Sequence, residues 1–331
     1  MPMRGSGWMG SLNAPFPYFG GKSRIAHLVW ERLGQPAHYI EPFCGTCAVL
    51  LARPDYDPAM HTETVNDADG HIGNVWRALQ FAPDEVAKWC DWPVNHADLI
   101  ARKAYINDKT DILLENLCKD PKWFDAEVAG YYIWAASCWI GSGLTRPGAI
   151  PHVTSKGMGV HASGKIPYLG SKGIGVHSNA KYFIYDWFAT LSARLRNVRV
   201  VCGDWARVCG GDWQDSTWPN VGIFFDPPYS AEAGRDNGIY AVESQTVAHD
   251  VREWCRGRAS RATYRICLAG YYDEHSSLLD EGWTVHQWKA GGGYGNIARS
   301  EEETQGQKNR HKEALFFSPH CVQPGLFSEA R

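Results

Sequence analysis

The chain has 331 residues, of which 44% are hydrophobic and 21% are charged, and its formal net charge is −3. This composition is typical of a water-soluble globular protein, and the length allows one large domain or two ordinary ones with a sizeable core. No run of about 18 apolar residues is present, the start lacks a signal-peptide core, and the ten cysteines form no double CxxC pattern, so we expect no membrane span, a cytoplasmic location and reduced thiols.

Seven short runs of β-branched and aromatic residues, bounded by Gly, Pro, Asp or Asn, predict strands. These runs are 38–43, 64–66, 198–202, 222–225, 265–269, 284–288 and 314–317. Helical patterns separate several of them, at 23–33, 47–53, 71–79, 181–195 and 247–256. This alternation predicts a mostly parallel α/β sheet covered on both faces. No convincing helix joins the last two runs, so we expect these two strands to be antiparallel.

The segment between the second and third predicted strands differs from the rest of the chain. Residues 82–140 have a helical pattern, whereas residues 141–180 are rich in Gly, Ser, Pro and Lys and contain the related peptides SKGMGVH and SKGIGVH. Charge is also segregated, because residues 54–128 contain 15 acidic and 7 basic side chains and residues 146–207 contain 9 basic and 2 acidic ones. We therefore predict an inserted lobe at 82–180 whose basic part meets a polyanion. A structural glycine-rich hairpin and a merely solvated basic surface remain alternatives.

Acidic residues lie close to the ends of the first three predicted strands, at the edge where open α/β sheets bind ligands. Glu41 and Phe43 precede Gly45, which allows a sharp turn and the close approach of a ligand. Asp67 follows the second strand, where a carboxylate can hold both hydroxyls of a ribose, and Asp204 follows the third as an acceptor for an adenine amine. No GxGxxG sequence is present, so a nucleoside without a diphosphate fits better than a dinucleotide. Each acid alone would also suit a helix cap.

The fourth predicted strand runs directly into the sequence DPPYS. Asp226 and the carbonyl group of Pro227 supply two neighbouring hydrogen-bond acceptors, and the rings of Pro227 and Pro228 fix the backbone. Tyr229 offers a flat surface on which a base can stack. Two acceptors beside an aromatic ring suit the exocyclic amine of a planar heterocycle. Hydrogen bonds from both amine hydrogens keep the nitrogen lone pair out of the ring, so that it is free to attack an electrophile.

Together these motifs resemble those of the Dam-like, α-group DNA adenine-N6 methyltransferases, in particular the phage-type members. The matching sequences are PYFGGKSRI, EPFCGTCAVLL, NDADGHI and DPPY, in that order, and the resemblance covers nearly the whole chain. It implies a Rossmann-like, seven-stranded methyltransferase sheet built from residues 1–81 and 181–318. A largely helical target-recognition lobe at 82–180 and a flexible tail at 319–331 complete this organisation. The implied reaction moves a methyl group from S-adenosylmethionine to the 6-amino group of a flipped adenine in double-stranded DNA.

The resemblance also implies roles for individual residues, and no metal is required. The residues implied to act on the target base are Asp226, Pro227, Pro228 and Tyr229. The residues implied to hold S-adenosylmethionine are Tyr18, Gly20, Gly21, Lys22, Glu41, Phe43, Gly45, Asp67, Asp204 and Asp226. In the basic stretch, our candidates for DNA phosphate contacts are Arg146, Lys156, Lys165 and Lys172. The family usually has a glycine where this chain has Cys47, so we expect a slightly narrower cofactor pocket.

Several partners and alternatives follow from the same reading. The peptide QPGLF at 323–327 resembles the motif that docks bacterial DNA enzymes on the replication sliding clamp, with Gln323, Leu326 and Phe327 as contacts. We otherwise expect a monomer in a prokaryotic or phage-infected cell, associated with the nucleoid, within a restriction–modification system, a phage or an orphan regulator. A cytosine-N4 methyltransferase, an RNA substrate and a non-catalytic DNA-binding module remain open. A redox role for Cys44 and Cys47 would leave Asp67 and DPPY without a purpose.

Overall fold

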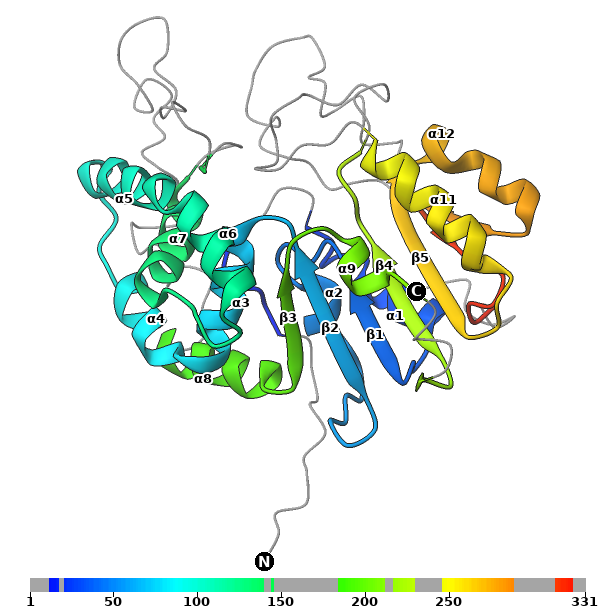
Figure 1. Cartoon of the computed structure of the whole chain (residues 1–331), viewed down its shortest axis with the longest axis horizontal. Helices are drawn as coiled ribbons and strands as arrows, with labels where there is room; N and C mark the ends of the chain where they lie inside the picture. Colours follow the sequence, from blue (N-terminus) through cyan, green and yellow to red (C-terminus); the bar gives the residue numbers. More distant parts are fainter. Residues whose placement is uncertain are drawn as a thin grey trace, which may run out of the picture.

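A seven-stranded sheet in the order β3-β2-β1-β4-β5-β7-β6 lies at the centre of the computed structural model (Figure 1). The structure describes residues 12–17, 21–139, 144–145, 184–211, 217–229, 246–288 and 313–323. Five neighbouring strands are parallel: β3 (Val198–Cys202), β2 (Thr62–Asp67), β1 (His38–Glu41), β4 (Val221–Phe225) and β5 (Tyr264–Tyr271). The last strand, β7 (Glu313–Phe317), is antiparallel to both of its neighbours, β5 and β6 (Thr284–Gln287). This sheet confirms the predicted Rossmann-like methyltransferase fold, including the antiparallel final pair.

Side chains along the central strands alternate between two apolar cores, as the period of two in a strand requires. In β4, Phe224 enters one core while Ile223 and Phe225 enter the other. In β7, Leu315 and Phe317 lie on the first side and Phe316 lies on the second. Both faces of the sheet are therefore buried, which explains why the strands read as nearly continuous apolar runs.

Helices cover both faces, and those on the first face contribute the larger core. The helices of the first face are α1 (Ala26–Leu33), α2 (Ala48–Leu51), α3 (Gly70–Phe81) and α8 (Ile184–Leu195). The second face is covered by α9 (Ala206–Cys209), α11 (Val247–Ala259) and the 3-10 turn η4 (Ser276–Glu281), while the short α12 (Tyr272–His275) follows β5. The five helices that we predicted in the sheet-forming part of the chain are all present.

Four further helices fill the first half of the predicted lobe: α4 (Pro83–Cys90), α5 (His96–Asp108), α6 (Thr110–Lys119) and α7 (Ala126–Cys138). They lie beside the β3 edge of the sheet (Figure 1). Val86 and Trp134 from these helices share one core with Trp76 of α3 and Phe188 of α8. The described part of the lobe is thus packed directly onto the helices of the sheet, and the lobe's boundaries stay a prediction.

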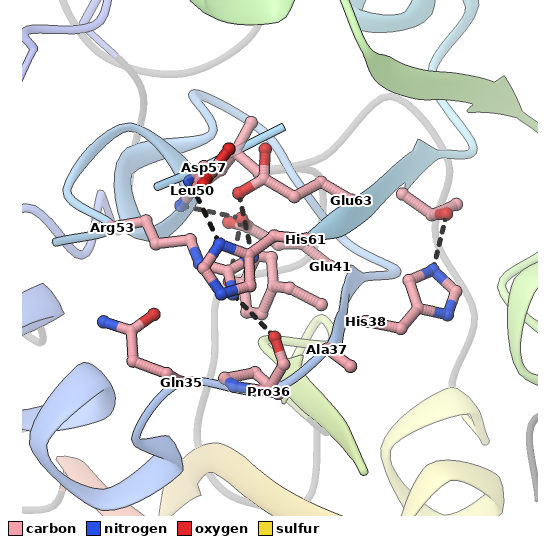
Figure 2. Close-up of polar contacts among 12 residues, drawn as sticks. Gln35, Pro36, Ala37, His38, Glu41, Leu50, Arg53, Asp57, His61 and Glu63 are labelled. Carbon is pink, nitrogen blue, oxygen red and sulfur yellow. Dashed lines mark hydrogen bonds and ion pairs between the residues drawn. The ribbon is translucent and has the colours of Figure 1, made fainter. Parts of the chain in front are cut away.

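A buried cluster of three charges fixes α2 and α8 to β2. The Glu63 carboxylate lies 3.2 Å from Nη1 of Arg53 and 2.6 Å from Nη1 of Arg194, and these side chains are 0%, 0% and 2% exposed. Arg53 also donates to the carbonyl oxygen of Pro36, as Figure 2 shows, and Arg194 donates to that of Leu50. Each guanidinium therefore has both a carboxylate and a carbonyl partner, which a buried charge requires.

Candidate active site

The loop after β1 closes over the end of β2 through a set of backbone hydrogen bonds. Gly45, with φ of 42°, donates its N–H to Oδ2 of Asp67 at 2.9 Å, and its carbonyl oxygen accepts from the indole of Trp76 at 2.7 Å. The other carboxylate oxygen, Oδ1, accepts from the N–H of Asp69 at 3.0 Å. Asp67 is consequently held with its carboxyl group at the carboxyl-terminal edge of the sheet, as predicted.

Asn66, which sequence reasoning missed, joins the ends of three strands. Its side-chain amide donates to the carbonyl oxygens of Pro42 at 2.9 Å and Gly203 at 3.0 Å, while its backbone carbonyl oxygen accepts from the N–H of Cys44 at 2.9 Å. Asn66 is 1% exposed. The only signal in the sequence was a polar residue directly before Asp67, an acid to which a role had already been assigned.

An apolar wall stands next to Asp67. The ring of Phe43 lies 6.4 Å from the rings of both Trp205 and Phe225, all measured between centroids. Asp204 is exposed at this end, and its carboxylate accepts from the N–H of Ala206, the first residue of the short helix α9. This hydrogen bond leaves lone pairs on the carboxylate, and its contact with an adenine amine stays a prediction. Trp205 carried no motif and was not predicted.

Two acids in this region differ from ordinary carboxylates, the half-buried Asp67 and the buried Glu41. Burial, aided by the nearby charge of Asp69, raises the pKa of Asp67 from 3.8 to about 7, although backbone N–H groups oppose the shift. Burial likewise raises the pKa of Glu41 from 4.5 to about 8. Glu41 is only 2% exposed, and its Oε2 accepts from the N–H of Leu50 and from the hydroxyl of Tyr39. Through these two hydrogen bonds Glu41 fastens the start of α2, which follows the Gly45 loop, to β1.

Cys47 occupies a conformation that favours glycine, with φ of 50°. This observation explains why relatives would carry glycine at the same position. Its side chain is 0% exposed and packs into the core of the first face. The thiol therefore points into packed protein, and the narrowing of an open cofactor pocket expected from the sequence has no support here.

The DPPY segment follows β4 directly and meets Lys22 from the start of the chain. Nζ of Lys22 lies 3.0 Å from Oδ2 of Asp226, with side chains 7% and 21% exposed. Burial raises the pKa of Asp226, and the charge of Lys22 opposes this shift. The Tyr229 hydroxyl donates to Asp226 Oδ1 at 3.5 Å, and its ring packs 4.7 Å from that of Tyr271. The ion pair was not predicted, since both residues were expected to face the cofactor.

The predicted site residues divide into those that the structure describes and those outside its described ranges. Tyr18 and Gly20 lie outside, whereas Gly21 is exposed and Lys22 is buried. Pro227 and Pro228 follow Asp226 at the end of β4. The phosphate-contact candidates Arg146, Lys156, Lys165 and Lys172 all lie outside the described residues. For the clamp-binding peptide, Gln323 is described and exposed, whereas Leu326 and Phe327 are not described.

Residues 18–129 match the family model of the D12 class N6 adenine-specific DNA methyltransferases. The matched residues make up about a third of the chain. The match includes Lys22, Gly45 and Asp67 and ends before the DPPY segment. It supports the Dam-like resemblance, and the D12 class implies a DNA adenine methyltransferase that uses S-adenosylmethionine as methyl donor.

Two further observations concern this chain. No curated protein sequence matches the chain. Among the described helices, none combines the length and apolar character needed to cross a membrane.

Proposed function

We propose that this D12 class enzyme transfers the methyl group of S-adenosylmethionine to the 6-amino group of an adenine turned out of double-stranded DNA. The observation that carries the proposal is the position of Asp226. It lies at the end of β4, and β1 with its Gly45 loop separates this strand from β2, which ends in Asp67. One carboxylate for the base and one for the cofactor thus share a single edge, as ligand sites in open α/β sheets do.

The residues present fit S-adenosylmethionine. Each carboxylate oxygen of Asp67 already accepts one backbone N–H, and each keeps a lone pair for a ribose hydroxyl. Phe43 and Trp205 offer apolar surface to a purine, with Asp204 within the same loop as Trp205 as an acceptor for its amine. When bound, the cofactor supplies an activated methyl group on a positively charged sulfur.

The DPPY residues would bind and activate the target amine. Turning the adenine out of the duplex costs a few kcal/mol, and stacking on Tyr229 would offset part of that cost. The Asp226 carboxylate and the Pro227 carbonyl oxygen would accept the two amine hydrogens, leaving the lone pair in line with the methyl group. Holding these atoms about 3–3.5 Å apart provides much of the acceleration. The amine then loses its proton to Asp226 or water.

Replacing Asp226 with alanine tests this assignment. We expect the rate of tritiated methyl transfer to duplex DNA to fall by at least about 10²-fold, because a preorganised acceptor is lost, while binding of duplex DNA persists. Asp250→Ala, at an exposed acid of α11, is the matched control. Digestion of the product to nucleosides must give N6-methyladenine. A fully active Asp226→Ala enzyme, or N4-methylcytosine as the product, would refute the proposal.

The remaining contacts extend the proposal to the rest of the chain. Residues 82–180 would recognise the target sequence, with Arg146, Lys156, Lys165 and Lys172 on phosphates. Replacing all four with alanine should weaken duplex binding and reduce its dependence on salt; unchanged binding would exclude this role.

The enzyme would act as a monomer, which sedimentation can check. A peptide of residues 319–331 should bind a bacterial sliding clamp, and no binding at high micromolar concentration would exclude that contact.

A further inference from the structure

An open cavity of about 290 Å³ lies in the helical part of the predicted lobe, between α4, the loop that follows it, α5 and α7. These helices lie beyond the β3 edge of the sheet, and β4, which leads to Asp226, is the fourth strand from that edge (Figure 1). The cavity shares no residue with the candidate active site. Its volume is close to the lower limit of about 300 Å³ for small-molecule sites, so it suits one small ligand. Four aromatic and two charged residues form most of its lining: Trp89, Trp92, Tyr105, Tyr131, Asp98 and Arg102.

The aromatic walls of this cavity are held in fixed positions. The Tyr131 ring meets the rings of Trp89 and Tyr105 edge to face, each with 5.5 Å between centroids. The backbone carbonyl oxygen of Trp92 accepts from the indole of Trp134 at 2.9 Å, which ties the loop after α4 to α7. Trp92 is nevertheless 49% exposed, so part of its surface is open to a ligand. Fixed aromatic rings around an opening suit a flat ligand that can stack on them.

Arg102 brings a positive charge to the cavity without an acidic partner. It is 7% exposed, and its Cζ lies 4.3 Å from the centre of the Tyr131 ring and 4.4 Å from that of Trp134. Its Nη1 donates to the backbone carbonyl oxygen of Trp89 at 2.9 Å. Within the described ranges no carboxylate forms an ion pair with Arg102. A guanidinium has five N–H donors and buried charges are normally paired, so its remaining donors can serve a ligand with two neighbouring acceptors.

Asp98 supplies a complementary acceptor in the same cavity. Its Oδ2 accepts from the indole N–H of Trp92 at 2.6 Å and from the side-chain amide of Asn95. The hydrogen bonds from Asn95 and Trp92 lower the pKa of Asp98, so this side chain is ionised at neutral pH. In the part of the chain that the structure describes, Oδ1 accepts no hydrogen bond. The carboxylate therefore keeps lone pairs for a ligand that donates.

These two charged groups restrict what the cavity can bind. Arg102 repels a cation, and Asp98 repels an isolated anion such as phosphate. The ligand is therefore expected to be flat and uncharged, with acceptors for Arg102 and donors for Asp98. Guanine alone among the DNA bases combines two neighbouring acceptors, N7 and O6, with two neighbouring donor groups, N1–H and the 2-amino group. Because a base pair uses both of these donor groups, the guanine has to be unpaired.

We propose that this cavity binds one unpaired guanine base, stacked against its aromatic walls, with N7 and O6 accepting from Arg102 and with N1–H and the 2-amino group donating to Asp98. The base can come from a nucleotide in solution or from single-stranded DNA, because both present the same edges. The cavity would be a second base-binding site, separate from that of the adenine. This inference uses neither the cofactor nor adenine and does not rest on the proposed function.

Isothermal titration calorimetry of the full-length protein tests the site, with saturating S-adenosylmethionine present to keep nucleotides out of the cofactor site. Guanosine 5′-monophosphate should bind at least about fivefold more tightly than inosine 5′-monophosphate, which lacks the 2-amino group. An oligothymidine strand with one central guanine should likewise bind more tightly than the same strand without it, and neither contains adenine. A preference seen only in the strands assigns the base to DNA, and one seen only in the nucleotides assigns it to a free nucleotide.

Asp98→Asn separates recognition of the base from packing, because the amide oxygen can still accept from Trp92 while the side chain no longer offers two acceptors. Its affinity for guanosine 5′-monophosphate should fall by at least about fivefold. It should also no longer distinguish this nucleotide from the inosine nucleotide. Asp108→Asn, at an exposed acid at the end of the same helix, is the matched control and should keep the distinction.

Three results would overturn the inference: equal binding of the guanosine and inosine nucleotides, a guanine preference that persists in Asp98→Asn, or no binding of either the nucleotides or the guanine-containing strand. If Asp98→Asn does not fold, the 7-deaza analogue of guanosine 5′-monophosphate takes its place on the unmodified protein. This analogue lacks the N7 acceptor, so it should bind more weakly than guanosine 5′-monophosphate, and equal binding would exclude the contact with Arg102.

Discussion

The replacement of Glu41 with glutamine gives a sharp test of the electrostatics beneath the active-site loop. Glu41 is 2% exposed, and its Oε2 accepts from the Tyr39 hydroxyl at 3.0 Å and from the N–H of Leu50 at 3.1 Å (Figure 2 shows Glu41 and Leu50). Burial raises its pKa from 4.5 to about 8, against the effect of these two hydrogen bonds. A glutamine carbonyl oxygen can accept both hydrogen bonds but cannot ionise.

The size of the effect follows from the two pKa values. Between pH 4.5 and about 8 the unfolded chain has lost the Glu41 proton while the folded chain keeps it. The folded state therefore binds one more proton, and its stability falls as the pH rises, by about 1.4 kcal/mol per pH unit. From pH 5 to pH 8 the wild-type protein should lose about 4 kcal/mol relative to Glu41→Gln, and above pH 8 the difference should level off.

Urea denaturation of both proteins at each pH from 5 to 9 measures this difference directly. Subtracting the free energies of unfolding of the wild-type protein and Glu41→Gln removes the contribution of every other titrating group whose pKa is the same in both proteins. Glu281→Gln, at an exposed acid, should give a difference that does not depend on pH. If the Glu41→Gln difference is also constant between pH 5 and pH 8, the buried acid is ionised throughout and the reasoning is wrong.

Two further predictions concern residues that fix the loop and its helix. Glu63→Gln leaves Arg53 and Arg194 buried without a carboxylate, so the free energy of unfolding should fall by about 3–5 kcal/mol; a loss below about 1 kcal/mol in urea denaturation would contradict a buried ion cluster. Cys47→Gly should be more stable than Cys47→Ala by about 1 kcal/mol, because alanine retains the cost of a left-handed conformation. Equal melting of these two variants would show that the loop does not require that conformation.

The strands could be predicted from sequence because each is short, most are rich in β-branched or aromatic residues, and each is bounded by residues that stop a strand. Predicted and observed limits differ by only a few residues, for example 222–225 against Val221–Phe225 for β4. The position of β7 between β5 and β6 could not be predicted from periodicity, since β5 and β7 are buried on both faces and their sequences do not indicate which strands they pair with. The direction of the final pair was predictable because no helix pattern lies between them.

Residues of the candidate site could be predicted where they stand in a sequence motif. They could not be predicted where their role depends on contacts between segments that lie far apart in the sequence. Asp67 and Asp226 end strands in recognisable motifs, and the structure places them at one edge. The pairing of Lys22 with Asp226 spans 204 residues (226 − 22), and no local pattern indicates it. The departure from glycine at Cys47 was recognised in the sequence. Its φ of 50° shows that this departure concerns the backbone conformation of the loop more than the width of the cofactor pocket.

The place of β7 also affects how the protein can be made. Of the strands that the structure describes, the one that comes last in the sequence lies inside the sheet, so β6 has no described strand to join until β7 is made, and until then one side of β5 is an open edge. An open edge invites pairing with other chains, and such exposure during synthesis is when multi-stranded proteins aggregate. A truncated chain that ends before residue 313 should therefore aggregate, instead of remaining a soluble enzyme that lacks only its C-terminal segment.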